Sequence, residues 1–329
     1  MNYAIIGCGL IGKKRLNGLP VGSQLVVACD TEITRAQELV KAAGTGRAVD
    51  DYYIAVADPG VGAVIVAVIN SALTEVTAAA IRAGKHVIVE KPAGISVEQL
   101  NELIALADIH KVCVRVGFNH RYHPAFQKAR EIFESGIMGE LMFIRARYGH
   151  GGRIGYDKEW RADPKLSGGG ELIDQGIHLI DLAGWFLGSF DRIQGHTDTY
   201  FWNMPVDDNA FMDLRTASGK TAWLHVSCTE WKNLFSFEIY GRVAKLHIEG
   251  LGGSYGVEKL HHYQMKPEMG IPDTYLYEFP GPDESWKIEM TAFEEDILLN
   301  RTPDAGLHEA LTSLTIVETL YQISDLKPL

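Results

Sequence analysis

The sequence has few features of secreted, membrane-spanning or nucleic-acid-binding proteins. Its only four cysteines show no paired spacing, and three of them lie in strand-like runs, where a buried, reduced thiol is usual. No run of about 18 or more apolar residues occurs, so we expect no membrane span. The formal net charge is -11, which argues against nucleic acid or an anionic membrane surface as a partner. The first apolar run is interrupted at once by GCGLIGKKR, unlike a secretory signal, and we expect a cytoplasmic protein.

Two kinds of hydrophobic periodicity divide the 329 residues into two predicted domains. Val- and Ile-rich runs such as VGAVIVAV and HVIVE alternate with amphipathic helical segments, which predicts an α/β Rossmann domain, a doubly wound parallel sheet, at residues 1–122. Later runs such as ELMFIRARYGH and FSFEIYGRVAKLHIEG alternate apolar with polar residues. That period of two predicts a large, mainly antiparallel open sheet in an α+β domain at residues 123–329. Two amphipathic helices, within residues 285–300 and 307–326, are expected to pack in this second domain.

A glycine motif follows the first predicted strand. Gly7, Gly9 and Gly12 give the spacing G-x-G-x-x-G at the point where a strand turns into a helix. Gly7 permits the tight turn, Gly9 leaves room for a pyrophosphate against bare backbone, and Gly12 lets the helix pack closely. The helix amino terminus supplies amide donors, so we expect a dinucleotide to bind here, with Leu10 and Ile11 also in contact.

An acidic residue stands where such a domain binds the adenosine ribose. Asp30 ends the strand-like run QLVVACD, eighteen residues after Gly12, and its carboxylate suits the ribose hydroxyls. A carboxylate would repel a 2′-phosphate, so we expect NAD. Arg35 lies close enough in sequence to keep NADP compatible with the motif.

Two further motifs follow strands of the first domain. VIVEKPAG places Glu90 and Lys91 at the end of a buried strand, and GFNHRYHP places Asn119 after the next one. Ligands of doubly wound sheets bind beyond the carboxyl ends of the strands. We therefore expect Glu90, Lys91 and Asn119 at the cofactor site, with the Lys91 ammonium directed into the crevice.

The segment GGGELIDQGIHLIDLAGWF carries three polar side chains within an otherwise apolar helix. Asp174, His178 and Asp181 share one helical face because they are spaced by four and three residues. A buried carboxylate needs a compensating partner, so we expect Asp174 and His178 to line a cleft between the domains. Asp181, one turn further, is expected to be structural and hydrogen-bonded to backbone.

A metal site is a rival interpretation of the same residues, with Asp174 and His178 sharing an ion with His150 or His120. No third ligand has dependable spacing, so we expect no metal.

Taken in order, these motifs resemble the family of glucose–fructose oxidoreductase, inositol dehydrogenase and MocA. The resemblance rests on IIGCGLIG, AGKHVIVEKP, GFNHRYHP and GGGELIDQGIHLIDL. It implies an NAD(P)-dependent oxidoreductase acting on a secondary hydroxyl of a sugar, a cyclitol or a sugar derivative. It also implies that Lys91, Asp174 and His178 are the catalytic residues. The chain departs from the family at VINSALTEVT, where Asn70 and Thr74 stand in place of a Thr-Pro pair and a later histidine, so Asn70 is expected at the cofactor site.

The residue types at these positions suit hydride transfer from a carbinol. The hydroxyl proton must leave as the hydride departs, and the developing oxyanion must be stabilised. An imidazole, with an ordinary pKa of about 6.5, can take that proton at neutral pH. Asp174 could orient the imidazole or bind a neighbouring substrate hydroxyl, and Lys91 could donate to the reacting oxygen. The sequence leaves open whether His178 or Lys91 is the final acceptor.

Substrate contacts are expected from the loop YGHGGRIGYDKEWRADPKLSGG, which lacks the periodicity of a regular element. Arginine and aromatic side chains there could bind an anionic group or stack on a sugar ring, and the predicted substrate contacts are Lys91, Asp174, His178, Arg153, Tyr156, Trp160 and Arg161. If both arginines face the cleft, a nucleotide sugar or sugar acid is favoured over a neutral cyclitol.

Two other functions remain compatible with the same motifs. One is elimination from a glycoside by transient oxidation with a retained NAD, and the other is a non-catalytic dinucleotide sensor. The joint presence of Lys91, Asp174 and His178 argues against a sensor, which needs no proton acceptor. An open sheet with one uncovered face also leads us to expect a homodimer or homotetramer.

Overall fold

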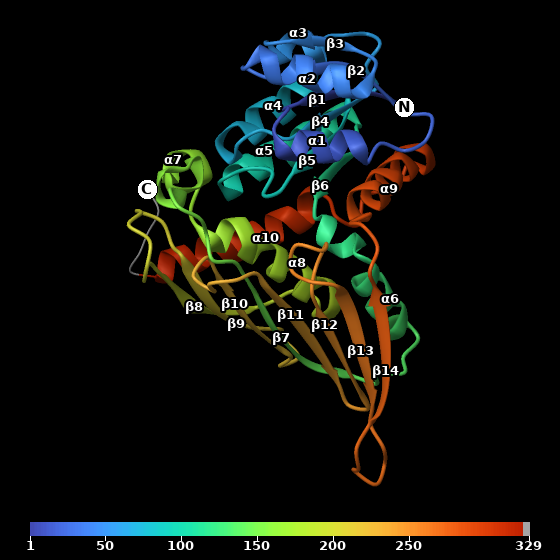
Figure 1. Cartoon of the computed structure of the whole chain (residues 1–329), viewed down its shortest axis with the longest axis vertical. Helices are drawn as coiled ribbons and strands as arrows, with labels where there is room; N and C mark the ends of the chain where they lie inside the picture. Colours follow the sequence, from blue (N-terminus) through green and yellow to red (C-terminus); the bar gives the residue numbers. More distant parts are fainter. Residues whose placement is uncertain (325–329) are drawn as a thin grey trace. The chain divides into compact units, whose positions relative to one another are not determined.

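A six-stranded parallel sheet forms the centre of the first of two compact units. The computed structural model describes residues 1–324. The first unit consists of Met1–Asn119 and Trp286–Leu314, and the second of His120–Ser285 and the chain from Thr315 onward. The first sheet has the order β3-β2-β1-β4-β5-β6 (Figure 1), and its strands are β1 (Asn2–Ile6), β2 (Gln24–Cys29), β3 (Arg47–Val49), β4 (Ala63–Val66), β5 (His86–Glu90) and β6 (Val114–Gly117). All residues of β4 and β6 are buried, so both faces of the sheet are covered. The predicted doubly wound sheet is confirmed.

Capping residues mark some of the helix ends in this unit. They are α1 (Leu10–Asn17), α2 (Ile33–Ala43), α3 (Tyr52–Val56), α4 (Asn70–Arg82), α5 (Val97–His110) and, from the far end of the chain, α9 (Ser285–Leu299). The Ser96 side chain accepts a hydrogen bond from the Gln99 amide at the start of α5, and Gly44 ends α2 in the left-handed conformation. Short loops between these helices and the strands give the sequence its alternating pattern.

The division between the units differs from the domain boundary expected after residue 122. The first stretch ends nearby, at Asn119, but Trp286–Leu314 belongs to the first unit rather than the second. The reason lies in packing across the whole sequence, since Met290 and Phe293 of α9 join Tyr3 and Ile5 of β1 in one buried core. α10 (Leu307–Ile323) begins in this unit and ends in the second. Residues 325–326 of the helix expected there lie outside the described residues.

An eight-stranded sheet forms the second unit. Its order is β14-β13-β12-β11-β7-β10-β9-β8, and β7 with β10 is its one parallel pair. The strands are β7 (Leu141–Gly149), β8 (Arg192–Asp198), β9 (Asn209–Arg215), β10 (Thr221–Ser227), β11 (Leu234–Gly241), β12 (Ala244–Glu249), β13 (Glu258–Gln264) and β14 (Asp273–Phe279). The predicted mainly antiparallel sheet is therefore confirmed.

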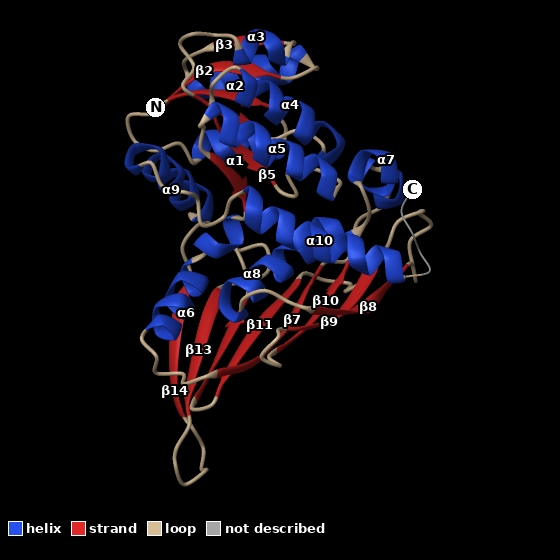
Figure 2. Ribbon diagram, turned by 180° about the vertical axis from the view of Figure 1, so that it is seen from behind, coloured by secondary structure: helices blue, strands red, loops and turns tan. Residues whose placement is uncertain are grey.

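Helices cover one face of this second sheet. α6 (Pro124–Glu134) packs on β12, β13 and β14, and α8 (Ile177–Leu187) packs on β7 and β10 (Figure 2). Shorter helical segments connect them: η1 (Asn119–Tyr122), η2 (Tyr156–Lys158), η3 (Trp160–Ala162), α7 (Pro164–Ser167) and η4 (Leu172–Gly176). Within residues 120–285 no helix lies on the opposite face, where Phe143 and Trp223 are exposed. Across residues 1–324, none of the helices has the length and apolar character needed to cross a bilayer.

Candidate active site

The glycine loop between β1 and α1 has a geometry that only glycine permits. Gly7 has a φ of +94°, and a Cβ atom there would lie 2.3 Å from the carbonyl oxygen of Ala67. A Cβ atom on Gly12 would lie 2.1 Å from the carbonyl oxygen of Gly7. A Cβ atom on Gly9 would meet nothing within 4 Å. Gly7 and Gly12 thus close the turn, and the open space at Gly9, beside the first turn of α1, fits a dinucleotide pyrophosphate.

Asp30 is held in place by the same loop. Its Oδ2 atom accepts a hydrogen bond of 2.8 Å from the Cys8 amide, and Oδ1 accepts one of 3.0 Å from the Glu32 amide. The carboxylate therefore lies next to the glycine loop, with a partly exposed surface. A ribose bound there would find an acceptor already oriented, as the sequence motif predicts.

The remaining predicted cofactor residues follow the carboxyl ends of neighbouring parallel strands. Lys91 follows β5 and is half-buried, and its peptide bond with Pro92 is cis. Asn70 is buried at the first residue of α4, and Asn119 is buried just after β6. Since β1, β4, β5 and β6 are parallel neighbours, these residues share one edge of the sheet with Gly7.

Glu90 has a partner that the sequence did not reveal. Its Oε1 atom accepts a 2.7 Å hydrogen bond from Nε of Arg15, and Arg15 Nη1 lies 2.5 Å from Oε2 of Glu289. Burial opposes the charge of Arg15, yet the two carboxylates raise its pKa, while burial raises the pKa of Glu289. A buried guanidinium between two carboxylates thus fixes the residue that precedes Lys91. The sequence shows Arg15 on the same face of α1 as Gly12. It does not show which carboxylates pair with Arg15.

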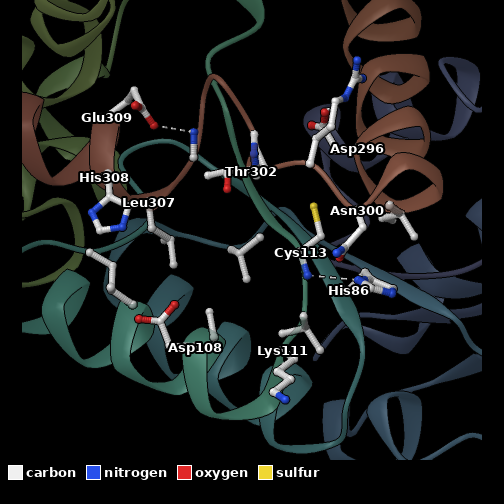
Figure 3. A pocket seen from close by; sticks show the side chains of 18 residues that line it. His86, Asp108, Lys111, Cys113, Asp296, Asn300, Thr302, Leu307, His308 and Glu309 are labelled. Carbon is white, nitrogen blue, oxygen red and sulfur yellow. Dashed lines mark hydrogen bonds and ion pairs between the residues drawn. The ribbon is translucent and has the colours of Figure 1, made fainter.

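A pocket of the first unit lies at the other edge of its sheet (Figure 3). Its volume is about 460 Å³, and its lining includes His86 at the start of β5, Cys113 just before β6, Lys111, Asn300 and Glu309. His86, Lys111 and Cys113 lie at the amino ends of β5 and β6, whereas the glycine loop and Lys91 follow the carboxyl ends of their strands. This pocket contains none of the predicted site residues.

In the second unit, the predicted helix begins with a π-helical turn. Asp174 lies within this turn, Leu172–Gly176, and His178 lies in the first turn of α8. Such turns widen the helix and are frequent at functional sites. Arg161 donates from Nε to Oδ2 of Asp174 at 3.0 Å, and its guanidinium stacks over the Trp160 ring at 4.5 Å. Burial acts against the charge of Arg161, but Asp174 raises its pKa. Three predicted substrate residues thus lie together.

The glycines before this turn let the chain approach a buried aspartate. A Cβ atom on Gly170 would lie 1.9 Å from the carbonyl oxygen of Asp207. The Asp207 carboxylate accepts hydrogen bonds from the amides of Gly170 and Leu172 and from the Tyr321 hydroxyl, and burial raises its pKa to about 6. Asp207 therefore anchors the segment that carries Asp174. The sequence around residue 170 did not predict this contact, because Asp207 lies far away along the chain.

Tyr156 and Glu171 form a second buried contact. The Tyr156 hydroxyl donates to Oε1 of Glu171 at 2.7 Å, and Nε2 of His150 lies 3.4 Å from the same oxygen. Burial raises the pKa of Tyr156. For His150, burial is the largest single effect and lowers the pKa, but the hydrogen bond and charge of Glu171 together with the charge of Asp174 raise it overall. Tyr156, a predicted substrate residue, is therefore 4% exposed and bonded within the protein.

Two other side chains have charged neighbours. Arg153 forms hydrogen bonds of 2.7 and 2.6 Å to the two carboxylate oxygens of Glu159, and its side chain is 64% exposed. Asp181 is buried and bonds the guanidinium of Arg121 at 2.8 and 2.6 Å. Asp181 was expected to be structural and bonded to backbone, and the structure shows Arg121 as one of its partners. Within residues 1–324, no group of three His, Cys, Asp or Glu side chains is arranged to hold a metal ion.

Both units of the chain are similar to known proteins. A model of an oxidoreductase family with an NAD-binding Rossmann fold covers residues 1–118, and a model of the GFO/IDH/MocA C-terminal domain covers residues 126–247. An uncharacterised oxidoreductase of Synechocystis is 30% identical over 98% of this chain and 93% of its own length. The NAD-dependent scyllo-inositol 2-dehydrogenase of Bacillus subtilis is 26% identical over 91% of this chain and 87% of its own. The solved structure of levoglucosan dehydrogenase with NADH and levoglucosan, at 21% identity, superposes with a TM-score of 0.87 over 98% of this chain and 96% of that one.

Proposed function

Because the chain belongs to the Gfo/Idh/MocA family of NAD-binding oxidoreductases, we propose that it interconverts a secondary hydroxyl of a neutral sugar or cyclitol with the ketone. The observation that supports this most is the polar set on the π-helical turn and the first turn of α8, Asp174 and His178, in a chain whose first unit carries the glycine loop and Lys91.

The first unit supplies the groups that would hold NAD. Amides of the glycine loop and the first turn of α1 would bind the pyrophosphate, and the Asp30 carboxylate would accept from the ribose hydroxyls. Asn70 and Asn119 would add contacts at the same edge of the sheet. Because the Asp30 carboxylate would repel a 2′-phosphate, NAD is the proposed cofactor rather than NADP.

In the proposed reaction, three side chains act on the carbinol: His178, Lys91 and Asp174. Bound NAD supplies a hydride acceptor. His178 takes the hydroxyl proton at one of its ring nitrogens, and the Lys91 ammonium donates to the oxygen and stabilises its developing charge. Asp174, already paired with Arg161, accepts a hydrogen bond from a neighbouring substrate hydroxyl. In ketone reduction the same groups work in reverse.

The state of the arginines favours a substrate without charge. Arg153 is bonded by Glu159, and Arg161 by Asp174. A phosphate or carboxylate would have to displace these carboxylates, whereas a hydroxyl-rich ring can share them. Two similar proteins are named for neutral compounds, scyllo-inositol and levoglucosan.

We further propose that a second copy of the chain covers the open face of the eight-stranded sheet. Exposed aromatic side chains on that face, Phe143 and Trp223, are suited to a buried interface. Light scattering should give a dimer or tetramer mass, and Trp223→Glu should lower it. A monomer at micromolar concentration would contradict this part of the proposal.

The function is tested by following NADH formation with purified protein. The panel contains scyllo-inositol, levoglucosan, a methyl glucoside, a sugar acid and a nucleotide sugar, each with NAD and with NADP. We expect stoichiometric NADH with a neutral member and NAD. Turnover without net NADH would instead support redox-assisted elimination, and binding of NAD without any turnover would support a sensor.

A further inference from the structure

Two histidine rings lie face to face in the second unit. His120, in η1, and His178, in α8, have ring centroids 3.8 Å apart and planes inclined by 20°. They are 6% and 5% exposed, so the stack is buried. In the sequence, His120 is a candidate only for a rival metal site, and residues 1–324 contain no cluster of three His, Cys, Asp or Glu side chains arranged to hold a metal.

Aromatic rings lie near the stack, and the elements around it also carry charged groups. The Tyr148 ring lies 5.4 Å from that of His120, and the His123 ring lies 5.7 Å from it, edge-on. The titratable groups on the elements packed around the two rings are Tyr148 on β7, Tyr255 beside Tyr148, Glu171 and Asp174 before α8, Asp181 paired with Arg121, and His123 paired with Glu258.

A second imidazole in this position differs from a plain aromatic ring in one respect, its ability to carry a proton. Two imidazolium rings at van der Waals distance repel each other, and burial disfavours even one such charge. The pair therefore resists taking up a second proton. A phenylalanine would pack equally well but would attract an imidazolium through its ring face.

We propose that His120 is a positioning residue for His178: its ring fixes the plane of the His178 imidazole and opposes protonation of that imidazole before substrate arrives. The inference rests on the proposed role of His178 as proton acceptor. A base that is already protonated cannot take the hydroxyl proton, so the stack extends the activity of the enzyme toward lower pH. It also limits rotation of the ring, which keeps the accepting nitrogen aimed at the substrate.

The first test measures protonation directly and does not depend on activity. Full-length protein labelled with 13C at histidine Cε1 is titrated by NMR, with the two signals assigned by their loss in His178→Asn and His120→Phe. In the wild type, the two rings should titrate as a coupled pair with two-step curves. Independent single-site curves with a common midpoint would overturn the proposal, and this measurement needs no variant to keep its native fold at the site.

The second test compares variants. His120→Phe keeps a stacked ring without the second charge, and we expect the His178 midpoint to rise by about one pH unit. The acid limb of the kcat/KM profile should move by the same amount, with kcat at alkaline pH within about threefold of wild type. His120→Ala removes the stack as well and should lower the alkaline kcat by about tenfold. His110→Phe, at an exposed histidine that ends α5, is the control and should change neither quantity.

The outcomes separate this proposal from the proposed function. A His178 midpoint in His120→Phe within about 0.2 units of wild type overturns the proposal even if the enzyme oxidises sugars. A shifted midpoint in NMR, combined with no shift in the activity profile of an active enzyme, also overturns it, because His178 would then not be the proton acceptor. Absence of dehydrogenase activity in the wild type would refute the proposed function, and with it the positioning role.

Discussion

The Nε atom of Arg161 lies 3.0 Å from Oδ2 of Asp174. This ion pair is partly exposed, with side-chain exposures of 34% and 16%, so it contributes little to stability but sets the charge beside α8. Arg161→Gln leaves the Asp174 carboxylate without this partner, and we expect kcat/KM to fall about tenfold, ~1.4 kcal/mol, with little change in Tm. Arg153→Gln on the same loop, where the partner is Glu159, should change kcat/KM less than about twofold. Equal losses in both variants would show that the Arg161 pair has no special role.

Asp30 should determine the choice between NAD and NADP. In Asp30→Ala, the acceptor for the ribose hydroxyls and the charge that repels a 2′-phosphate are both lost. We expect KM for NAD to rise by about tenfold or more and the preference for NAD over NADP to shrink by about a hundredfold. Steady-state kinetics with both cofactors gives the ratio. An unchanged ratio would place the ribose elsewhere.

The Glu90–Arg15–Glu289 contact should be one of the main stabilising features of the first unit. Arg15 is fully buried, so Arg15→Met leaves buried carboxylates without their cation and should destabilise the protein by about 3–5 kcal/mol. Glu289→Gln keeps a hydrogen-bond acceptor, and because burial raises the pKa of Glu289, we expect a loss of only ~1 kcal/mol. Urea unfolding measures both. Arg15→Met with wild-type stability would contradict the assignment.

Asp207 should make stability depend on pH between about 4 and 6. Burial raises the pKa of Asp207 in the folded protein to about 6, from an ordinary value of 3.8. Because the pKa of Asp207 is higher in the folded than in the unfolded protein, Asp207 stabilises the folded state at pH values below its unfolded pKa. This stabilisation is lost as the pH rises through its folded pKa. The loss amounts to roughly 2–3 kcal/mol. The free energy of unfolding should therefore fall less steeply with rising pH in Asp207→Asn than in wild type, and parallel curves over this window would contradict the prediction.

The local geometry of the glycine loop and of Asp30 was easier to predict from sequence than the contacts that support them. The glycine loop and Asp30 could be recognised because their spacing is fixed by one turn of chain, and the structure gives them the expected geometry. The spacing of Asp174 and His178 likewise predicted a shared helical segment. The role of arginines such as Arg153 was harder to predict. A sequence does not show whether the guanidinium is already paired with a carboxylate of the protein, as Arg153 is with Glu159.

What the sequence could not predict are contacts between residues far apart along the chain. The Glu289 carboxylate bonds Arg15, which is 274 residues away in the sequence. The Asp207 carboxylate bonds the Leu172 amide, which is 35 residues away. The same reason applies to Trp286–Leu314, which belongs to the first unit. The sequence shows that this segment has apolar residues but not which sheet they pack against. The stacking of His120 on His178 also depends on how two separate segments pack.

The central claim is that Lys91 and His178 serve one proton-coupled hydride transfer. The most direct measurement is single-turnover NADH formation by wild type, Lys91→Met and His178→Asn with the neutral substrate found in the screen, alongside NADH affinity by fluorescence. We expect each variant to bind NADH within about threefold of wild type and to lose at least about a thousandfold in the rate of the single turnover. A variant that binds NADH normally and transfers hydride at the wild-type rate would contradict the account.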